Sequence, residues 1–157
     1  MSHPIQILVG TMTGSAELVA QELDQSFRDA GYVPKITMMD ALDASALAAG
    51  GVFLIISSTY GNGDVPDNAQ AFFSSLKVEG PDLSLVTYGL IALGDMTYKA
   101  TFCHGGLKFD ALLTELGAKR LGTPLLHDAN GGRRAEDAAC DWVATWIGQE
   151  LAPAAAA

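Results

Sequence analysis

IQILVGTMTGSAE, residues 5–17, joins a short apolar segment to a turn made of threonine, serine and glycine. Residues 5–10 are apolar and lie between Pro4 and the turn, which predicts a buried strand. Residues 16–30 then repeat apolar side chains at helical spacing until Gly31 ends the run. The segment therefore predicts a strand, a hydroxyl-rich turn and a helix in direct succession.

The turn at residues 11–16 has the chemistry of an anion site. Its backbone N–H groups precede the predicted helix, at the end where the helix dipole favours negative charge. Hydroxyl groups on Thr11, Thr13 and Ser15 add donors, so a dianion can be held without lysine or arginine. The lysine of the triphosphate-binding pattern G-x-x-x-x-G-K-[ST] is missing. The turn predicts a site for a terminal monophosphate, although a plain strand-to-helix turn with a hydroxyl N-cap has a similar sequence.

The composition is that of one acidic domain. The chain has 157 residues, of which 49% are hydrophobic, and its 18 acidic and 9 basic residues give a formal net charge of −9. This charge argues against nucleic acid or an anionic membrane as a partner and favours a basic protein surface. We expect a single domain over residues 1–151 and a disordered tail at residues 152–157.

Cysteine usage and the N-terminus indicate a cytoplasmic protein. Cys103 and Cys140 have neither the spacing of a metal site nor that of a disulfide framework, so we expect two reduced thiols and no metal. We find no basic and apolar signal segment and no apolar run of bilayer length.

Strand and helix patterns alternate along the rest of the chain. The further predicted strands are residues 32–38, 52–56, 88–93 and 120–126, and the further predicted helices are residues 41–49, 66–76, 105–116 and 135–147. The continuous apolar run at 52–56 is typical of a central strand, and Pro124 places the last strand at an edge. Five strands alternating with five helices predict a doubly wound parallel sheet, whose ligands bind beyond the carboxyl ends of the strands.

Two further loops follow strands at this edge of the sheet. Residues 57–64 follow the third strand and contain Tyr60, and residues 94–103 follow the fourth strand and contain Tyr98. Two aromatic rings on neighbouring loops can hold a flat ligand between them. Together with the anion site, they indicate a flat heterocycle that carries a phosphorylated tail.

The three loops together resemble those of the flavodoxin family, and the likeness extends along nearly the whole chain. Residues 11–17 are similar to the family's phosphate loop, in the form shared by the flavin domains of diflavin reductases. Residues 58–69 and 92–98 resemble the two loops that enclose the flavin. One departure is Ala16, where many flavodoxins have a hydroxyl. The chain resembles a short, stand-alone flavodoxin of the MioC type.

This resemblance implies a fold and a cofactor. The fold is the flavodoxin-like α/β three-layer sandwich, in which the five-stranded parallel sheet has the order 2-1-3-4-5. The cofactor is riboflavin 5′-phosphate (FMN), with its phosphate on the first loop and its ring between the two tyrosines. The residues expected to contact it are Thr11, Met12, Thr13, Gly14, Ser15, Ala16, Ser58, Thr59, Tyr60, Gly61, Asn62, Gly63, Gly94, Asp95, Thr97, Tyr98, Phe102, Cys103 and Asp128.

The implied function is electron transport rather than catalysis. A monomeric carrier of low potential would take single electrons from an NADPH-dependent reductase of the ferredoxin/flavodoxin-NADP type and pass them to acceptor enzymes. The Gly61 peptide can turn its carbonyl toward the flavin N5–H, because glycine tolerates a positive φ. Asp64, Asp67, Asp95 and Asp128 are expected at the cofactor edge, where they would oppose the negative charge of reduction and dock basic partners.

Two other functions remain open, and one is excluded. An FMN-dependent NAD(P)H:quinone reductase would have a similar flavin site, and a flavodoxin-shaped interaction module would bind no flavin. A response-regulator receiver needs an acidic pair after the first strand and a phosphoacceptor aspartate after the third. These places hold Thr11-Met12 and Ser57-Ser58.

Overall fold

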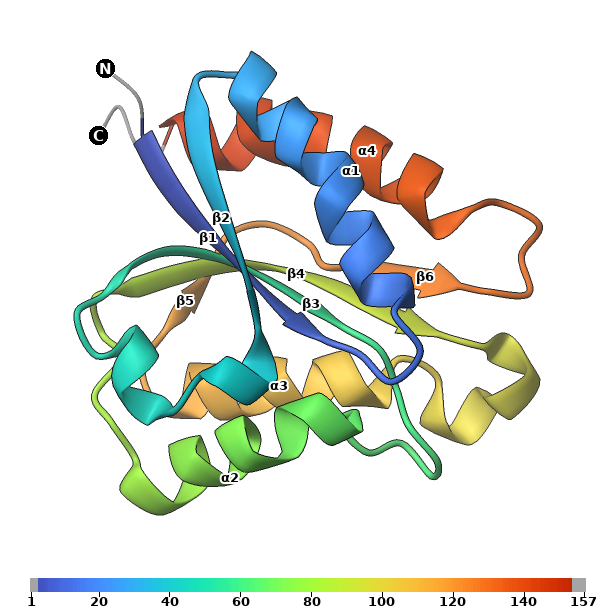
Figure 1. The fold of residues 1–157 in the computed structure, drawn as a ribbon, viewed down its shortest axis with the longest axis horizontal. Coiled ribbons are helices and arrows are strands. Elements are labelled where there is room, and N and C mark those ends of the chain that lie inside the picture. The colour runs from blue at the N-terminus through green and yellow to red at the C-terminus, as the bar shows by residue number, and fades with distance from the viewer. Residues whose placement is uncertain (1–2, 154–157) are drawn as a thin grey trace.

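A parallel sheet between two layers of helices forms the protein in the computed structural model, which describes residues 3–153 (Figure 1). The strands are β1 (His3–Gly10), β2 (Tyr32–Met38), β3 (Gly51–Ser57), β4 (Val86–Gly94), β5 (Lys119–Arg120) and β6 (Leu125–Asp128). Their order is β2-β1-β3-β4-β5, and β6 also pairs with β4. Every ladder between these strands is parallel. The predicted flavodoxin-like α/β fold and strand order are confirmed.

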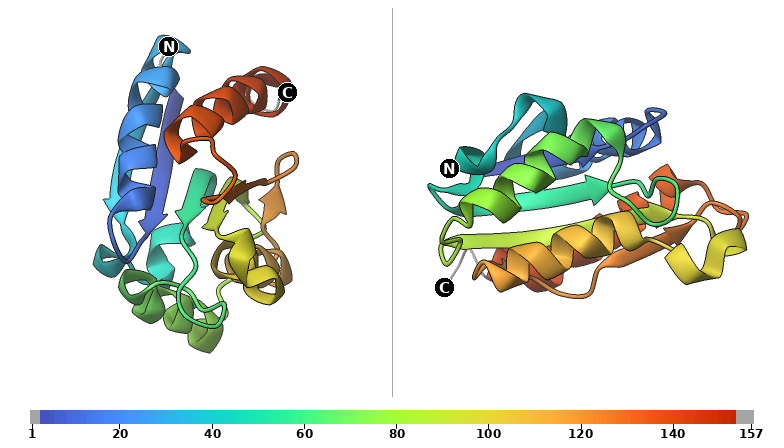
Figure 2. Two further views of the ribbon diagram at one scale, coloured as in Figure 1. Left: turned by 90° about the vertical axis from the view of Figure 1, so that its right-hand side faces the viewer. Right: turned by 90° about the horizontal axis from the view of Figure 1, so that it is seen from below.

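The helices cover both faces of the sheet. They are α1 (Ser15–Asp29), α2 (Gln70–Glu79), α3 (His104–Glu115) and α4 (Ala135–Trp146). Helices α1 and α4 lie on one face, and α2 and α3 lie on the other (Figures 1 and 2). In β1, Ile7 and Val9 pack toward α1 and α4, whereas Leu8 packs toward α2 and α3. Because both faces are covered, the central strands need apolar side chains at nearly every position.

The two tryptophans of α4 pack together at the core, where Trp146 is buried and Trp142 is partly buried. The Trp142 and Trp146 rings stack with centroids 5.3 Å apart, and Trp146 meets the Phe27 ring edge-on at 6.4 Å. The Trp146 indole N–H donates to the Leu121 carbonyl at 2.8 Å, so its polar atom is satisfied inside the core. Gly89 of β4 leaves the space that this ring pair occupies.

The predicted helix at residues 41–49 is wrong. Two separate 3₁₀ turns, Met39–Ala41 and Ala44–Leu47, take its place. The Asp43 carboxylate accepts from the Ser45 backbone N–H, which stops one continuous helix from forming across this position. The alanine-rich composition favours a helix, but the segment is too short to override this cap.

The predicted strand at residues 120–126 is divided into β5 and β6. Gly122 adopts a positive φ of 75°, and Pro124 cannot donate to a ladder, so the two parts pair with β4 separately. The edge position expected from Pro124 is confirmed. In the predicted tail, Ala152 and Pro153 are still helical, and residues 154–157 lie outside the described residues.

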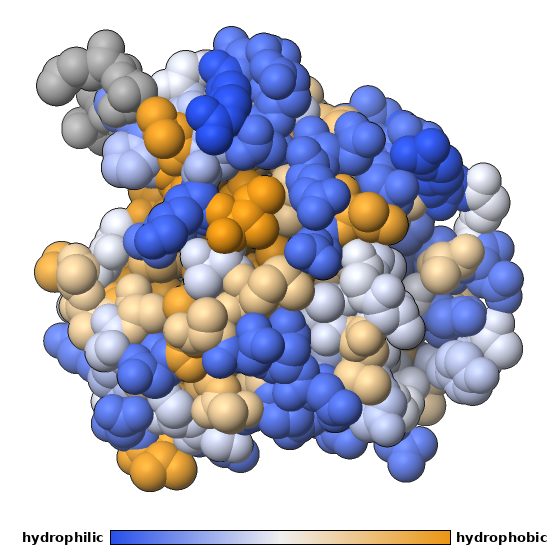
Figure 3. All heavy atoms as spheres, viewed as in Figure 1, coloured by the Kyte–Doolittle hydropathy of each residue, from blue (hydrophilic) through white to orange (hydrophobic). Residues whose placement is uncertain are grey.

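On the side of the molecule in Figure 3, hydrophobic residues form separate patches between hydrophilic ones. Within residues 3–153, every helix is too short or too polar to cross a bilayer. The same residues contain no group of three or more His, Cys, Asp or Glu side chains placed to hold a metal ion.

We expect Gly89→Ala to destabilise the fold by about 1–3 kcal/mol. A Cβ atom at this position would lie 2.5 Å from a ring carbon of Trp146, which is 2% exposed, so the packing of the core would have to shift. Urea unfolding followed by circular dichroism measures the effect. Gly148→Ala is the control, because its Cβ meets nothing within 4 Å. Equal stability of the two variants would show that the indole packing is looser than described.

Candidate functional site

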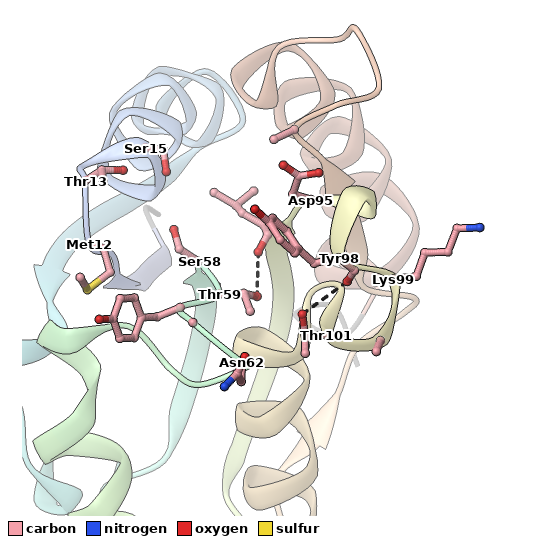
Figure 4. Close-up of a pocket in the computed structure, with 16 residues that line it drawn as sticks. Met12, Thr13, Ser15, Ser58, Thr59, Asn62, Asp95, Tyr98, Lys99 and Thr101 are labelled. Carbon is pink, nitrogen blue, oxygen red and sulfur yellow. Dashed lines mark hydrogen bonds between the residues drawn. The ribbon is translucent and has the colours of Figure 1, made fainter.

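A cleft of about 870 Å³ opens at the carboxyl ends of β1, β3 and β4. This volume suits a cofactor-sized ligand. Three loops line the cleft, and they follow these three strands (Figure 4). The left view of Figure 2 looks onto this end of the sheet.

The loop between β1 and α1 presents free backbone donors. Gly14 precedes α1 in the left-handed conformation, with a φ of 93°, and its N–H donates to the Thr11 hydroxyl at 2.9 Å. The Thr11 N–H donates to the Asn68 side-chain oxygen at 2.7 Å. Within the described chain, the N–H groups at positions 12, 13, 15 and 16 have no acceptor. With the N-terminus of α1 behind them, they form a nest suited to a phosphate.

The loop after β3 is a tight turn held from two sides. Tyr60 and Asp64 exchange two backbone hydrogen bonds of 2.8 Å, and Gly61 and Gly63 adopt φ values of 54° and 96°. The Lys108 ammonium of α3 lies 3.1 Å from the Asp64 carboxylate and ties the turn to that helix. Tyr60 remains 45% exposed although its loop is held in place on both sides.

The loop after β4 carries the second ring. It forms a 3₁₀ segment, Met96–Thr101, that begins where the Asp95 carboxylate accepts from the Thr97 N–H. The Tyr98 ring is 66% exposed and stands across the cleft from Met12 (Figure 4). The cleft therefore has one tyrosine on each of two neighbouring loops.

Asp128 supports this loop from behind. Its Oδ1 accepts from the backbone N–H of Met96 at 3.0 Å and from that of Asn130 at 2.9 Å. These two hydrogen bonds hold the pKa of Asp128 below its ordinary value. Asp128, which the sequence predicts to contact the cofactor, therefore connects the end of β6 to the Tyr98 loop.

Thr59 lines the cleft, and two glycines of α3, outside the lining, pack closely against Ser58 and Ala92. The Thr59 hydroxyl donates to the Leu93 carbonyl at 3.0 Å (Figure 4) and accepts from the Gly105 N–H at 3.1 Å. A Cβ at Gly105 would lie 2.3 Å from the Ser58 carbonyl, and one at Gly106 would lie 2.5 Å from the Ala92 Cβ. Sequence reasoning missed this pair, although two glycines at the start of a predicted helix were the available signal.

Cys103 lies behind the wall of the cleft. Its side chain is fully buried, and its thiol donates to the Ala92 carbonyl at 3.3 Å. Burial, with a smaller contribution from the Asp128 charge, raises the pKa of this thiol to about 12. Its φ of 58° makes it the one non-glycine residue with a positive φ in the described part of the chain.

The structure brings most of the expected contact residues to the cleft. Those that line it are Met12, Thr13, Ser15, Ser58, Thr59, Tyr60, Gly61, Asn62, Gly94, Asp95 and Tyr98. Those that lie beside or behind the lining are Thr11, Gly14, Ala16, Gly63, Thr97, Phe102, Cys103 and Asp128. The lining residues absent from the sequence prediction are Leu93, Lys99, Ala100, Thr101 and Ala129. Lys99 itself points away from the cleft (Figure 4).

The donor set fits FMN. Among the buried side-chain nitrogen and oxygen atoms of residues 3–153, the Ser58 hydroxyl oxygen alone has no hydrogen-bond partner, and Ser58 lines the cleft. A buried hydroxyl without a partner is unfavourable unless a ligand supplies one. The nest at positions 12–16 matches a phosphate, and the two exposed tyrosines match a flat ring.

Comparisons with known proteins agree with this geometry. The flavodoxin family model matches residues 7–142. Flavodoxin YqcA of Pectobacterium carotovorum subsp. carotovorum is 39% identical and aligns over 90% of this chain and 93% of its own length. Protein MioC of Escherichia coli is 36% identical over 91% of this chain and 95% of its own. A mutant flavodoxin from Pseudomonas aeruginosa superposes with a TM-score of 0.82 at 30% identity, covering 92% of this chain and 97% of its own.

We expect stability to fall with rising pH because of Cys103. Its folded pKa of about 12 lies above that of an ordinary thiol, so the unfolded chain loses this proton first. The stabilisation is complete below the unfolded pKa of about 8.5, and above it the free energy of unfolding falls by about 1.4 kcal/mol per pH unit. Urea unfolding at several pH values between 7.5 and 9.5 measures this slope. Cys140→Ala should retain the slope, and a Cys103→Ala variant with the same slope would contradict the assignment.

Proposed function

The chain belongs to the flavodoxin family, and we propose that it binds FMN in this cleft and carries single electrons between proteins. Members of the family are typically FMN-binding electron carriers rather than enzymes. The donor we propose is an NADPH-dependent flavoprotein reductase of the ferredoxin/flavodoxin-NADP type, and the acceptors are redox enzymes. The observation that carries the proposal is a phosphate nest and two exposed tyrosines around one cleft.

The phosphate end would be held by hydrogen bonds rather than by ion pairs. The free N–H groups at positions 12, 13, 15 and 16 and the Thr13 and Ser15 hydroxyls supply donors. Ala16 removes one hydroxyl that many flavodoxins have at this position, but its N–H is still free. The Ser58 hydroxyl gains a partner when the ligand enters. These contacts favour FMN over flavins that lack the phosphate.

The ring end would be held between Tyr60 and Tyr98. When bound, FMN supplies the redox chemistry of the protein. Each tyrosine that stacks on the ring buries apolar area and adds roughly 0.5–1.5 kcal/mol beyond that area. The Gly61 carbonyl, on a peptide that already has a positive φ, can rotate toward a ring N–H without a Cβ clash. The chain would thus orient the ring and offer a carbonyl oxygen that accepts a hydrogen bond from the ring N–H.

Carboxylates near the cleft would oppose a negative charge on the reduced cofactor. Asp95 lines the cleft, and Asp67 is exposed on the segment after the Tyr60 loop. One such charge at about 10 Å and an effective dielectric of 20 is worth roughly 1.7 kcal/mol, or about 70 mV for one electron. Asp64 contributes less than the sequence suggests, because Lys108 pairs with it. The excess of acids also favours docking of this monomer to a basic partner surface.

The test of function separates the carrier from the two alternatives. We expect the purified protein to bind FMN, to take up electrons in two one-electron steps during dithionite titration, and to stay oxidised with NADPH alone. A catalytic amount of a ferredoxin-NADP reductase should then reduce it, at a rate that falls as salt rises. Direct reduction by NADPH would favour the quinone-reductase type of function. A protein that cannot be loaded with FMN would favour the interaction module.

We expect Gly61→Val to narrow the gap between the two one-electron reduction potentials. A β-branched side chain disfavours rotation of the Gly61 carbonyl at a positive φ by about 1–2 kcal/mol, which moves each of the two potentials toward the other by roughly 40–90 mV. Potentiometric titration of the FMN-loaded variant beside the wild type measures the gap. Val78→Ala is a control, because that side chain is 85% exposed and lies on α2, outside the cleft lining. An unchanged gap in Gly61→Val would rule out the carbonyl rotation.

A further inference from the structure

We infer that Asn68 is a positioning residue that holds the phosphate loop in its anion-binding shape, and that it thereby sets the preference for FMN over riboflavin. The inference rests on the proposed function. Asn68 does not line the cleft, so it would act only through the loop that it supports.

Two hydrogen bonds join Asn68 to the end of β1. Its side-chain oxygen accepts from the Thr11 N–H at 2.7 Å, and its side-chain nitrogen donates to the Val9 carbonyl at 3.2 Å. These contacts span 57 and 59 residues of sequence, so they are tertiary contacts and not local turns. One amide therefore satisfies a donor and an acceptor on either side of Gly10.

Further hydrogen bonds connect Thr11 to the nest. The Thr11 hydroxyl accepts from the Gly14 N–H at 2.9 Å, and the Gly14 carbonyl accepts from the Leu18 N–H at 3.1 Å, in the first turn of α1. Asn68, Thr11 and Gly14 thus form a continuous series of contacts from the β3–α2 connection to the start of the helix. Two N–H groups are used to shape the loop, and those at positions 12, 13, 15 and 16 are left for the ligand.

A second contact binds the same two segments together. The Asp67 N–H lies 3.1 Å from the Met12 sulfur, and a Cβ at Gly10 would meet Ala69 and Pro66 at 3.3 Å each. The phosphate loop therefore rests directly on the segment that follows the Tyr60 turn. Without Asn68, the Thr11 N–H would lose its acceptor while the packing below it stayed in place. The expected consequence is a misaligned nest and not a displaced tyrosine.

A purely structural role would affect both ligands alike. Riboflavin has the same ring as FMN and lacks the phosphate, so it does not require an ordered nest. A residue that acts through the nest should change FMN affinity and leave riboflavin affinity nearly unaltered. A residue that merely stabilises the fold should weaken both by the same factor.

The test compares Asn68→Ala with Gln70→Ala. Gln70 is a matched control, because its side-chain amide also bonds to a backbone carbonyl, that of Val65 at 2.6 Å, without reaching the phosphate loop. Dissociation constants for FMN and riboflavin are measured by quenching of flavin fluorescence. Hydrogen exchange of the Thr11 and Gly14 amides is measured by NMR on the flavin-free proteins.

We expect Asn68→Ala to weaken FMN binding about tenfold and to change riboflavin binding less than twofold. The Thr11 and Gly14 amides should exchange faster, and Gln70→Ala should match the wild type throughout. If Asn68→Ala does not fold, Asn68→Ser is measured in its place, because its shorter, uncharged side chain cannot span both the Thr11 N–H and the Val9 carbonyl. It should lose FMN affinity selectively as well.

Equal losses for both flavins, or unchanged FMN binding, would overturn the role of Asn68 and leave the proposed function standing. A wild-type protein that binds neither flavin would overturn the proposed function and this inference together. The wild-type titration therefore distinguishes the two failures.

Discussion

Burial of a parallel sheet on both faces is the constraint from which the rest of the structure follows. Helices α1 and α4 on one face and α2 and α3 on the other bury the central strands, so that these strands meet solvent mainly at their ends. Backbone groups at the carboxyl ends of β1, β3 and β4 must then find partners in the loops. The cleft lies at the point where those loops separate.

Side chains from one loop satisfy the backbone of another around this cleft. Asn68 accepts a hydrogen bond from the loop after β1, and Asp128 accepts one from the loop after β4. Thr59 is hydrogen-bonded to both β4 and α3. These four bonds join protein groups to one another, so they restrict the motion of the loops around the cleft. Restricted loops lose less conformational entropy on binding, which strengthens binding without additional contacts.

The sequence predicts the parts of the fold that depend on local pattern. The strand and turn at residues 5–17 and the two tyrosine loops come together as expected, because apolar runs and hydroxyl-rich turns carry their own signals. Tertiary effects explain the failures. The 41–49 segment has helical composition, but Asp43 caps a short turn within it. The hydrogen bond from Met96 to Asp128 and the packing of Gly105 against the Ser58 carbonyl join residues distant in sequence. No local sequence pattern shows such contacts.

Because Lys108 pairs with Asp64, the charge next to the cleft does not follow the net charge of the molecule. One lysine on α3 compensates a carboxylate at its rim, while the excess of acids elsewhere keeps the net charge strongly negative. Two homologues with identical isoelectric points would therefore differ in the reduction potential of the proposed cofactor if only one of them carried a cation at the position of Lys108. Under the proposed function, a single surface substitution at this position would change the reduction potential of the bound cofactor, with no alteration to the nest or the rings.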